Sequence, residues 1–368
     1  MSKFKTTNIT DLLGVSQLCS ITPEDVWNII VTPQVKALLG EILSSKVSVR
    51  DDIAGDFPGD EVFNHHGHKI NGQDTSKVRY PYVHCFYKTT YGAFVVKYEG
   101  MKLKASCWFG DMKKPQLIYL VALRDRRFDG TDRVNDGCLH AYPEFALAHN
   151  ATPKFPGAPE DFSFVEASIY AFMPGSRIYE ACGDRQLDRF VEQPFEFLDR
   201  PELFLELFGK AWKSHRSPGQ NGNPIPDVSK NVVAGFDTLA RKAGYDFIDS
   251  SVSHYHVARW TDANGYLYHK AEDKATMEQL AAGIKRVRSE LKAKGIELTR
   301  PQESWLVVLQ SLSADKIPAE FNFNGPKWIW DNICPFYLWM CKPLSERAIA
   351  YQTQRVAQAA QAAPVASK

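Results

Sequence analysis

The sequence predicts an α+β fold in which antiparallel sheets, formed as a meander and hairpins, are flanked by helices. Between about residues 78 and 128, short alternating segments follow one another with short connections, which favours antiparallel pairing over parallel βαβ units. Elsewhere, apolar residues recur at helical spacing behind recognisable caps. The chain has 368 residues, enough for the two subdomains that we expect.

The first predicted strands lie between about residues 94 and 124, a region rich in basic and aromatic residues. Residues 94–98 and 101–105 alternate apolar with basic side chains on either side of Glu99-Gly100, as in a hairpin with one apolar and one basic face. Residues 116–124 predict a further strand. Two more are expected at residues 162–172 and 176–182, joined by a turn at Pro174-Gly175.

Helices are predicted near the N-terminus and through most of the second half. Thr22 to Asp25 has a threonine N-cap, a proline and acids in the first turn. A long helix is expected over residues 272–294, with its acids early and its bases late. Thr299 to Gln302 matches a capping box. Further helices are predicted at residues 185–198, 201–213 and from 229 to about 243.

The Gly- and Pro-rich stretch at residues 214–229 is the best candidate for a linker or mobile loop. It separates an N-terminal α+β subdomain, residues 1–213, from a C-terminal one, residues 230–353. Residues 354–368 are rich in alanine and glutamine and are expected to form a flexible tail.

Composition limits the classes of function. A formal net charge of +1 argues against a general nucleic-acid coat, although a local basic patch is compatible with it. The seven cysteines contain no C-x-x-C pair, which favours a reducing, cytoplasmic setting. We find no secretory signal at the N-terminus and no apolar run long enough to span a membrane, so no membrane partner is expected.

The most informative segment runs from Ser251 to His269 and is interpreted as a β-hairpin. Alternation would place His254 and His256 on one face, and pairing across the turn would bring His269 to the same face. Imidazoles spaced in this way suit a divalent metal ion, either zinc or manganese. The alternative is that these histidines cover a sheet or bond locally, because H-x-H alone is a weak signal.

Two neighbours of the histidines are assigned catalytic roles under the metal hypothesis. Asp262 would act as a fourth ligand or as a base, and Arg259 would orient an anionic substrate. Asp249 is a further acid that could contribute if the loops fold back. A metal-free variant would use one histidine as a general base.

A second histidine cluster, His65, His66 and His68, lies in a loop rich in Asp and Gly. Histidines and carboxylates close together could also bind zinc or manganese, although such loops are usually only solvated. The sequence does not show whether this loop meets the hairpin.

The basic face of the first hairpin is a candidate surface for a nucleotide or nucleic acid. Lysines beside a tryptophan combine phosphate contacts with base stacking. The residues are Lys97, Lys102, Lys104 and Trp108, with Lys97 expected opposite Lys102. The alternative is the ordinary solvent face of an antiparallel sheet, where lysine also discourages edge pairing.

No P-loop, Rossmann glycine motif, nucleophile elbow or kinase signature occurs in the chain. The leading hypothesis is an intracellular enzyme with metal-assisted or histidine-dependent chemistry on a nucleotide or nucleic acid. The first alternative is a non-catalytic nucleic-acid- or protein-binding module that uses the lysine face. The second is an assembly protein whose interface contains the C-terminal aromatics around Trp328 and Trp339.

Overall fold

The structure is a computed structural model, and its contacts divide the chain into two units. The first comprises Met1–Pro174, Ile225–Asp249 and Lys342–Lys368, and the second comprises Gly175–Pro224 and Ser250–Cys341. The described residues are 17–31, 33, 48–50, 69–70, 73–74, 84–88, 92–99, 102–109, 116–125, 158–159, 161–171, 182–220, 228–328 and 338–362. Helices and a mixed sheet confirm the α+β class.

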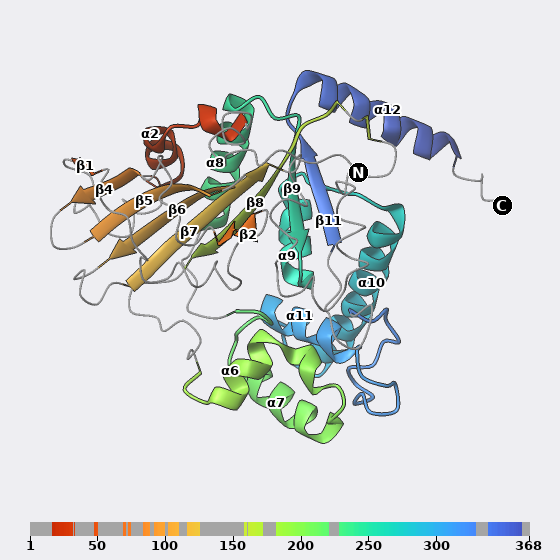
Figure 1. Ribbon diagram of the computed structural model, residues 1–368. Helices are drawn as coiled ribbons and strands as arrows, with labels where there is room; N and C mark the ends of the chain where they lie inside the picture. The colour runs from red at the N-terminus through yellow and green to blue at the C-terminus, as the bar shows by residue number, and fades with distance from the viewer. Residues whose placement is uncertain are drawn as a thin grey trace. The chain divides into compact units, whose positions relative to one another are not determined.

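The first unit is built on a sheet whose strands lie side by side in Figure 1. Its strands are β1 (Ser48–Arg50), β4 (His84–Lys88), β5 (Gly92–Glu99), β6 (Lys102–Phe109), β7 (Gln116–Asp125), β8 (Phe164–Ala171) and β9 (Phe247–Val252), which begins in this unit. They follow the order β1-β4-β5-β6-β7-β8-β9. A further strand, β11 (Leu338–Pro343), belongs mainly to the second unit. Two short strands, β2 (Lys69–Ile70) and β3 (Gln73–Asp74), form a separate pair.

The sequence predicts purely antiparallel sheets, whereas the observed sheet is mixed. Neighbouring strands from β1 to β8 pair antiparallel, whereas β8 and β9 are parallel, with Phe164 opposite Phe247. Parallel neighbours need a long crossover connection. The connection from β8 to β9 runs through several helices, the last of which is α8 (Val228–Lys242). Reading adjacent strands in sequence as hairpins could not reveal this crossover.

Further helical elements complete the first unit: η1 (Gln17–Ser20), α2 (Pro23–Val26), η2 (Trp27–Val31) and the longer α12 (Glu346–Ala362). The Gln17 side-chain amide donates to the carbonyls of Ala243 (3.0 Å) and Gly244 (2.8 Å), which satisfies acceptors at the end of α8. The segment predicted as a flexible tail from residue 354 is helical as far as Ala362.

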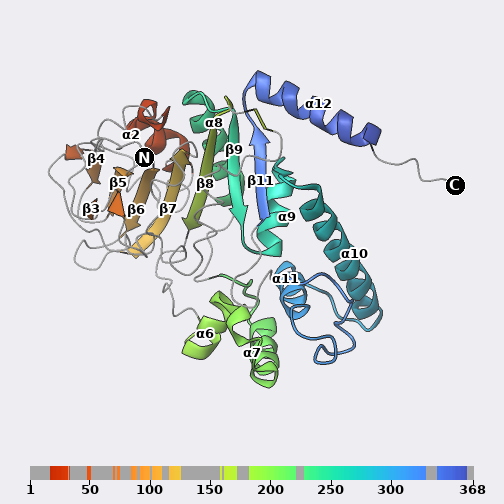
Figure 2. The same ribbon diagram turned by 45° about the vertical axis from the view of Figure 1, so that its right-hand side comes forward.

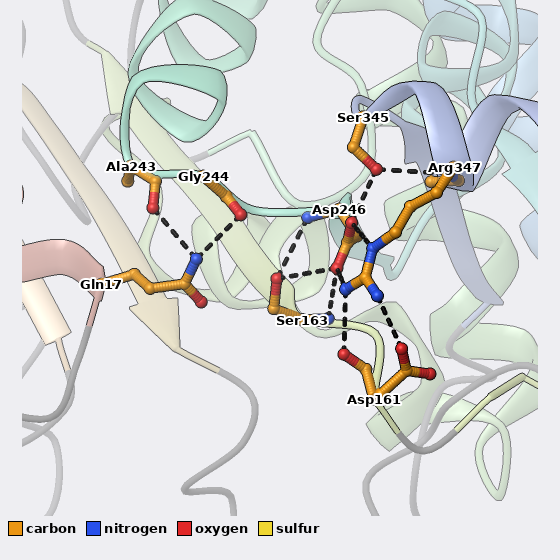
Figure 3. Close-up of polar contacts among 9 residues, drawn as sticks. Gln17, Asp161, Ser163, Ala243, Gly244, Asp246, Ser345 and Arg347 are labelled. Carbon is orange, nitrogen blue, oxygen red and sulfur yellow. Dashed lines mark hydrogen bonds and ion pairs between the residues drawn. The ribbon is translucent and has the colours of Figure 1, made fainter.

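The Asp246 carboxylate joins three distant segments of the first unit (Figure 3). It is 3% exposed and accepts hydrogen bonds from the backbone N–H (2.9 Å) and hydroxyl (3.1 Å) of Ser163. It also accepts from the Ser345 hydroxyl (2.6 Å) and from two guanidinium nitrogens of Arg347. Burial acts to raise the pKa of Asp246, but these donors outweigh it and the pKa is lowered.

The second unit is mainly helical (Figure 2). It contains α6 (Arg185–Glu192), η8 (Pro194–Phe197), α7 (Pro201–Lys213), α9 (Tyr255–Ala263), α10 (Ala271–Ala293), α11 (Arg300–Leu309) and the short strand β10 (Leu267–Tyr268), which pairs with β11. Its core includes Trp305, which stacks on Phe190 with ring centres 5.3 Å apart. The predicted capping box at Thr299 and the predicted long helix are both confirmed.

The predicted hairpin over residues 251–269 is wrong. Residues 255–263 form helix α9, on which Tyr255, Ala258 and Thr261 are buried at helical spacing. The hairpin would have required a turn within residues 262–265, but these residues end the helix instead: Asn264 is the C-cap, and Gly265 has a φ of 85°. The parity argument that placed three histidines on one strand face therefore fails.

Asp246 gives the first testable prediction. We expect Asp246→Asn to lower the free energy of unfolding by about 2–4 kcal/mol, because it removes the charge that Arg347 and the serines surround. The matched control is Asp161→Asn, which alters the exposed second partner of Arg347 (68% side-chain exposure) and should cost less than about 1 kcal/mol. Urea unfolding measures both, and equal losses would contradict the prediction.

The same carboxylate predicts a pH dependence. Because its folded-state pKa lies below the ordinary value of 3.8, its contribution to stability is full above that value. The contribution is lost as the pH falls through the folded-state pKa. Unfolding midpoints measured between pH 7 and pH 2.5 should therefore fall more steeply at acid pH for the wild type than for Asp246→Asn. Parallel curves would show that Asp246 is not the group responsible.

Two helical glycines of the second unit predict opposite effects of alanine. A Cβ at Gly283 on α10 would lie 2.1 Å from the Phe323 ring, whereas a Cβ at Gly209 on α7 would meet nothing within 4 Å. We expect Gly283→Ala to destabilise the protein by about 1–3 kcal/mol through overpacking. Gly209→Ala should stabilise it by roughly 0.5–1 kcal/mol through helix propensity. Thermal and urea unfolding of the two variants test this contrast.

Candidate functional site

Two histidines lie at the junction between a strand and a helix. β9 ends at Val252, Ser253 follows, and His254 is the N-cap of α9 with an extended backbone (φ −139°, ψ 149°). His256 lies in the first turn of that helix. Their ring centres are 5.8 Å apart and their planes are tilted by 38°. The sequence thus brings both imidazoles together, although by a helix start and not by strand alternation.

Each imidazole is held by a serine hydroxyl. His254 Nδ1 lies 2.8 Å from the Ser253 hydroxyl, and His256 Nδ1 lies 3.0 Å from the hydroxyl of Ser304 on α11. Within the described part of the chain, the Nε2 atoms of both rings have no hydrogen-bond partner. Serine bonds at Nδ1 fix ring orientation and leave Nε2 as the nitrogen open to a ligand. We call His254, His256, Ser253 and Ser304 the histidine–serine cluster.

Both imidazoles of the cluster are neutral at physiological pH. Burial, with a smaller contribution from the nearby His256, lowers the pKa of His254 to about 3. Burial alone lowers the pKa of His256 to about 4. Neutral imidazole is the form that binds metal ions. A base with a pKa this low accepts protons poorly near pH 7, so the metal-free general-base variant is chemically less suited to this cluster.

The two residues assigned catalytic roles lie on the exposed side of α9. Arg259 and Asp262 form an ion pair with each other at 3.8 Å, and their side chains are 53% and 43% exposed. Among the residues that the structure describes, neither side chain has a hydrogen bond or ion pair with the histidine–serine cluster. Their assignment depended on the hairpin, which placed Asp262 at a turn beside the histidines. Their catalytic role remains a prediction without structural support.

His269 belongs to a different group from the other two histidines. Asp249, His269 and Cys341 are buried, and each offers one ligand atom within 4.8 Å of the others, so the group could hold a metal ion. It is the one set of three such side chains among the residues that the structure describes, and it includes neither His254 nor His256. The predicted convergence of His254, His256 and His269 is therefore corrected.

The lysine face has a different register from the predicted one. Lys97 pairs with Lys104 and not with Lys102, which pairs with Glu99. Trp108 pairs with Ala93. Each partner on β6 lies two positions further along the strand than the expected pairing required, so Glu99 stands opposite Lys102. Nucleotide or nucleic-acid binding at this face remains a prediction.

Other predictions fall outside the described residues. The His65, His66 and His68 loop is one of these, and so are residues 221–227 of the predicted linker and residues 363–368 of the predicted tail.

No helix among the described residues has the length and apolar character needed to cross a membrane. The cytoplasmic location remains a prediction.

Sequence reasoning missed both serines and the cysteine. Ser253 precedes His254 directly, so a local signal for it existed. Ser304 lies 48 positions beyond its partner His256, and no spacing rule connects the two. Cys341 lies in an aromatic stretch of the sequence that gives no metal-site signal. Asp249 is considered as an additional ligand from the sequence, and the structure groups it with His269 and Cys341.

Comparison with known proteins gives no functional assignment: no family model, curated protein or solved structure matches this chain.

The low pKa values give a prediction for the metal-free protein. The Cε1 proton resonances of His254 and His256 should not shift between pH 5.5 and pH 8, because both rings stay neutral across this range. The same two resonances in urea-unfolded protein should titrate near pH 6.5. NMR with single His→Gln variants assigns the signals. A folded-state midpoint above pH 6 for either ring would contradict the neutral cluster.

Proposed function

We propose that the protein is a metal-dependent enzyme in which the Nε2 atoms of His254 and His256 hold a divalent ion. The observation that carries this proposal is the pair of serine bonds at Nδ1, which leaves the opposite nitrogen of each ring for a ligand. Zinc is favoured over manganese, because neutral imidazole is a better ligand for zinc and carboxylate a better one for manganese.

The spacing of the rings supports one shared ion. A zinc–nitrogen distance of about 2 Å places the centres of two ligating imidazoles roughly 5–6 Å apart. The observed separation of 5.8 Å falls in this range.

An ion with two protein nitrogens keeps coordination positions for water and for substrate. The chemistry that it supplies is activation of the water or polarisation of a phosphoryl or carbonyl oxygen. The role of this chain's own residues is to orient the imidazoles through Ser253 and Ser304 and to keep them unprotonated. A nucleotide or nucleic acid remains the proposed substrate class.

Elemental analysis of the purified full-length chain tests this proposal. We expect about one ion per chain in the wild type and none in His254→Ala or in His256→Ala. His215→Asn is the matched control, because His215 is exposed and its φ of 56° is one that asparagine tolerates. This control should retain the ion.

A third variant separates the two candidate groups. If Cys341→Ser loses the ion while both histidine variants keep it, the ion belongs with Asp249, His269 and Cys341, and the proposed site is wrong. Wild-type protein that contains no ion and takes up neither Zn²⁺ nor Co²⁺ at micromolar concentrations would overturn the metal proposal itself.

A further inference from the structure

We propose that Gly219 is a positioning residue for His254. The proposal rests on the proposed metal function and adds to it a segment that is distant in sequence from both histidines. Gly219 lies in the stretch interpreted from sequence as a linker or mobile loop. In the structure this part of the stretch lies against the His254 ring, in the same unit of the chain.

The contact is closer than any side chain at position 219 would allow. A Cβ there would lie 2.5 Å from His254 Cε1, 2.9 Å from Nε2 and 3.0 Å from Nδ1. Glycine therefore permits the backbone to lie close to the imidazole, with Cε1 as the nearest ring atom. Gly219 also has a φ of 76°, which glycine adopts without strain.

The turn around Gly219 cannot easily move away from the ring. The Gly219 N–H donates to the Val191 carbonyl (2.6 Å) at the end of α6. The Trp305 indole N–H donates to the Arg216 carbonyl (2.6 Å), and Trp305 is itself fully buried against Phe190. The segment is thus anchored on two helices of the second unit.

The ring is restrained as well. Its Nδ1 is held by Ser253, and the Ser253 carbonyl accepts from the buried Trp328 indole at 2.7 Å. The His256 ring lies beside it. Because neither side yields freely, a methyl group at position 219 should turn the imidazole away from its present orientation and displace Nε2.

Gly183 provides a matched control for the backbone effect. Its φ of 75° is nearly that of Gly219, yet a Cβ at position 183 would meet nothing within 4 Å. Gly219→Ala and Gly183→Ala therefore introduce the same strain in the same unit, and only the first introduces a contact with His254. A second pair, Gly219→Asn and Gly183→Asn, uses a residue that tolerates positive φ, in case the alanine variants fail to fold.

Titration of the metal-free full-length chain with Co²⁺, followed by its visible absorption, provides the first readout. We expect Gly219→Ala to weaken Co²⁺ binding by roughly 10–100-fold, the usual effect of disturbing the support of a ligating histidine. Gly183→Ala should stay within about twofold of the wild type. Equal affinities for the two variants, measured with folded protein, would overturn the proposal.

Imidazole NMR provides a second readout that does not need a metal. The ¹⁵N shift of His254 Nδ1 reports its bond to Ser253, and we expect it to change in Gly219→Ala and not in Gly183→Ala. If wild-type protein fails to bind Co²⁺, the proposed function fails, while this shift still decides whether Gly219 orients the ring. An unchanged His254 shift in Gly219→Ala would show that it does not.

Discussion

The pairing of Asp246 with Arg347 is the interaction on which the arrangement of the first unit depends. A carboxylate that is 3% exposed is stable only when donors surround it, and here those donors come from two separate parts of the chain, Ser163 and the segment from Ser345 to Arg347. Neither segment supplies all of the donors alone. The backbone N–H groups of Asp246 and Phe247 also donate to the Ser163 carbonyl, so the same contact fixes where β9 begins beside β8.

The position at which β9 begins also determines the position of the residues that follow its end. From Phe247 the strand runs to Val252, and a break at Ser253 then leads into α9, so His254 falls at the helix N-cap. Partial positive charge at a helix N-terminus disfavours a protonated imidazole. This acts in the same direction as burial, the main cause of the low pKa values of both histidines. The local fold thus converts a residue suited to proton transfer into one suited to ligation.

The sequence predicts an element correctly where its apolar spacing and its capping residues indicate the same structure. It fails where the spacing fits both a helix and a strand. On α10, five apolar residues recur at helical spacing over about four turns, and the structure buries all of them: Met277, Leu280, Ile284, Val287 and Leu291. α9 has only nine residues, and its histidines alternate by chance with Tyr255 and Val257. Over so short a segment, the pattern of apolar and polar residues fits strand alternation almost as well as helical spacing. Asn264-Gly265 then satisfied a hairpin turn as readily as a helix end.

The candidate site was predictable only in its histidines, because the groups that define its chemistry come from distant segments. Ser304 is placed by α11, whose position follows from the packing of Trp305 on Phe190, and such packing leaves no pattern at His256. Gly219 matters because it has no Cβ, which would otherwise meet the His254 ring. The sequence shows a glycine in a polar loop but does not show which residue packs against it. A histidine pair therefore acquires a specific geometry only through tertiary contacts. The same sequence letters, His-x-His, would be unremarkable on the exposed side of α9, where Arg259 and Asp262 lie.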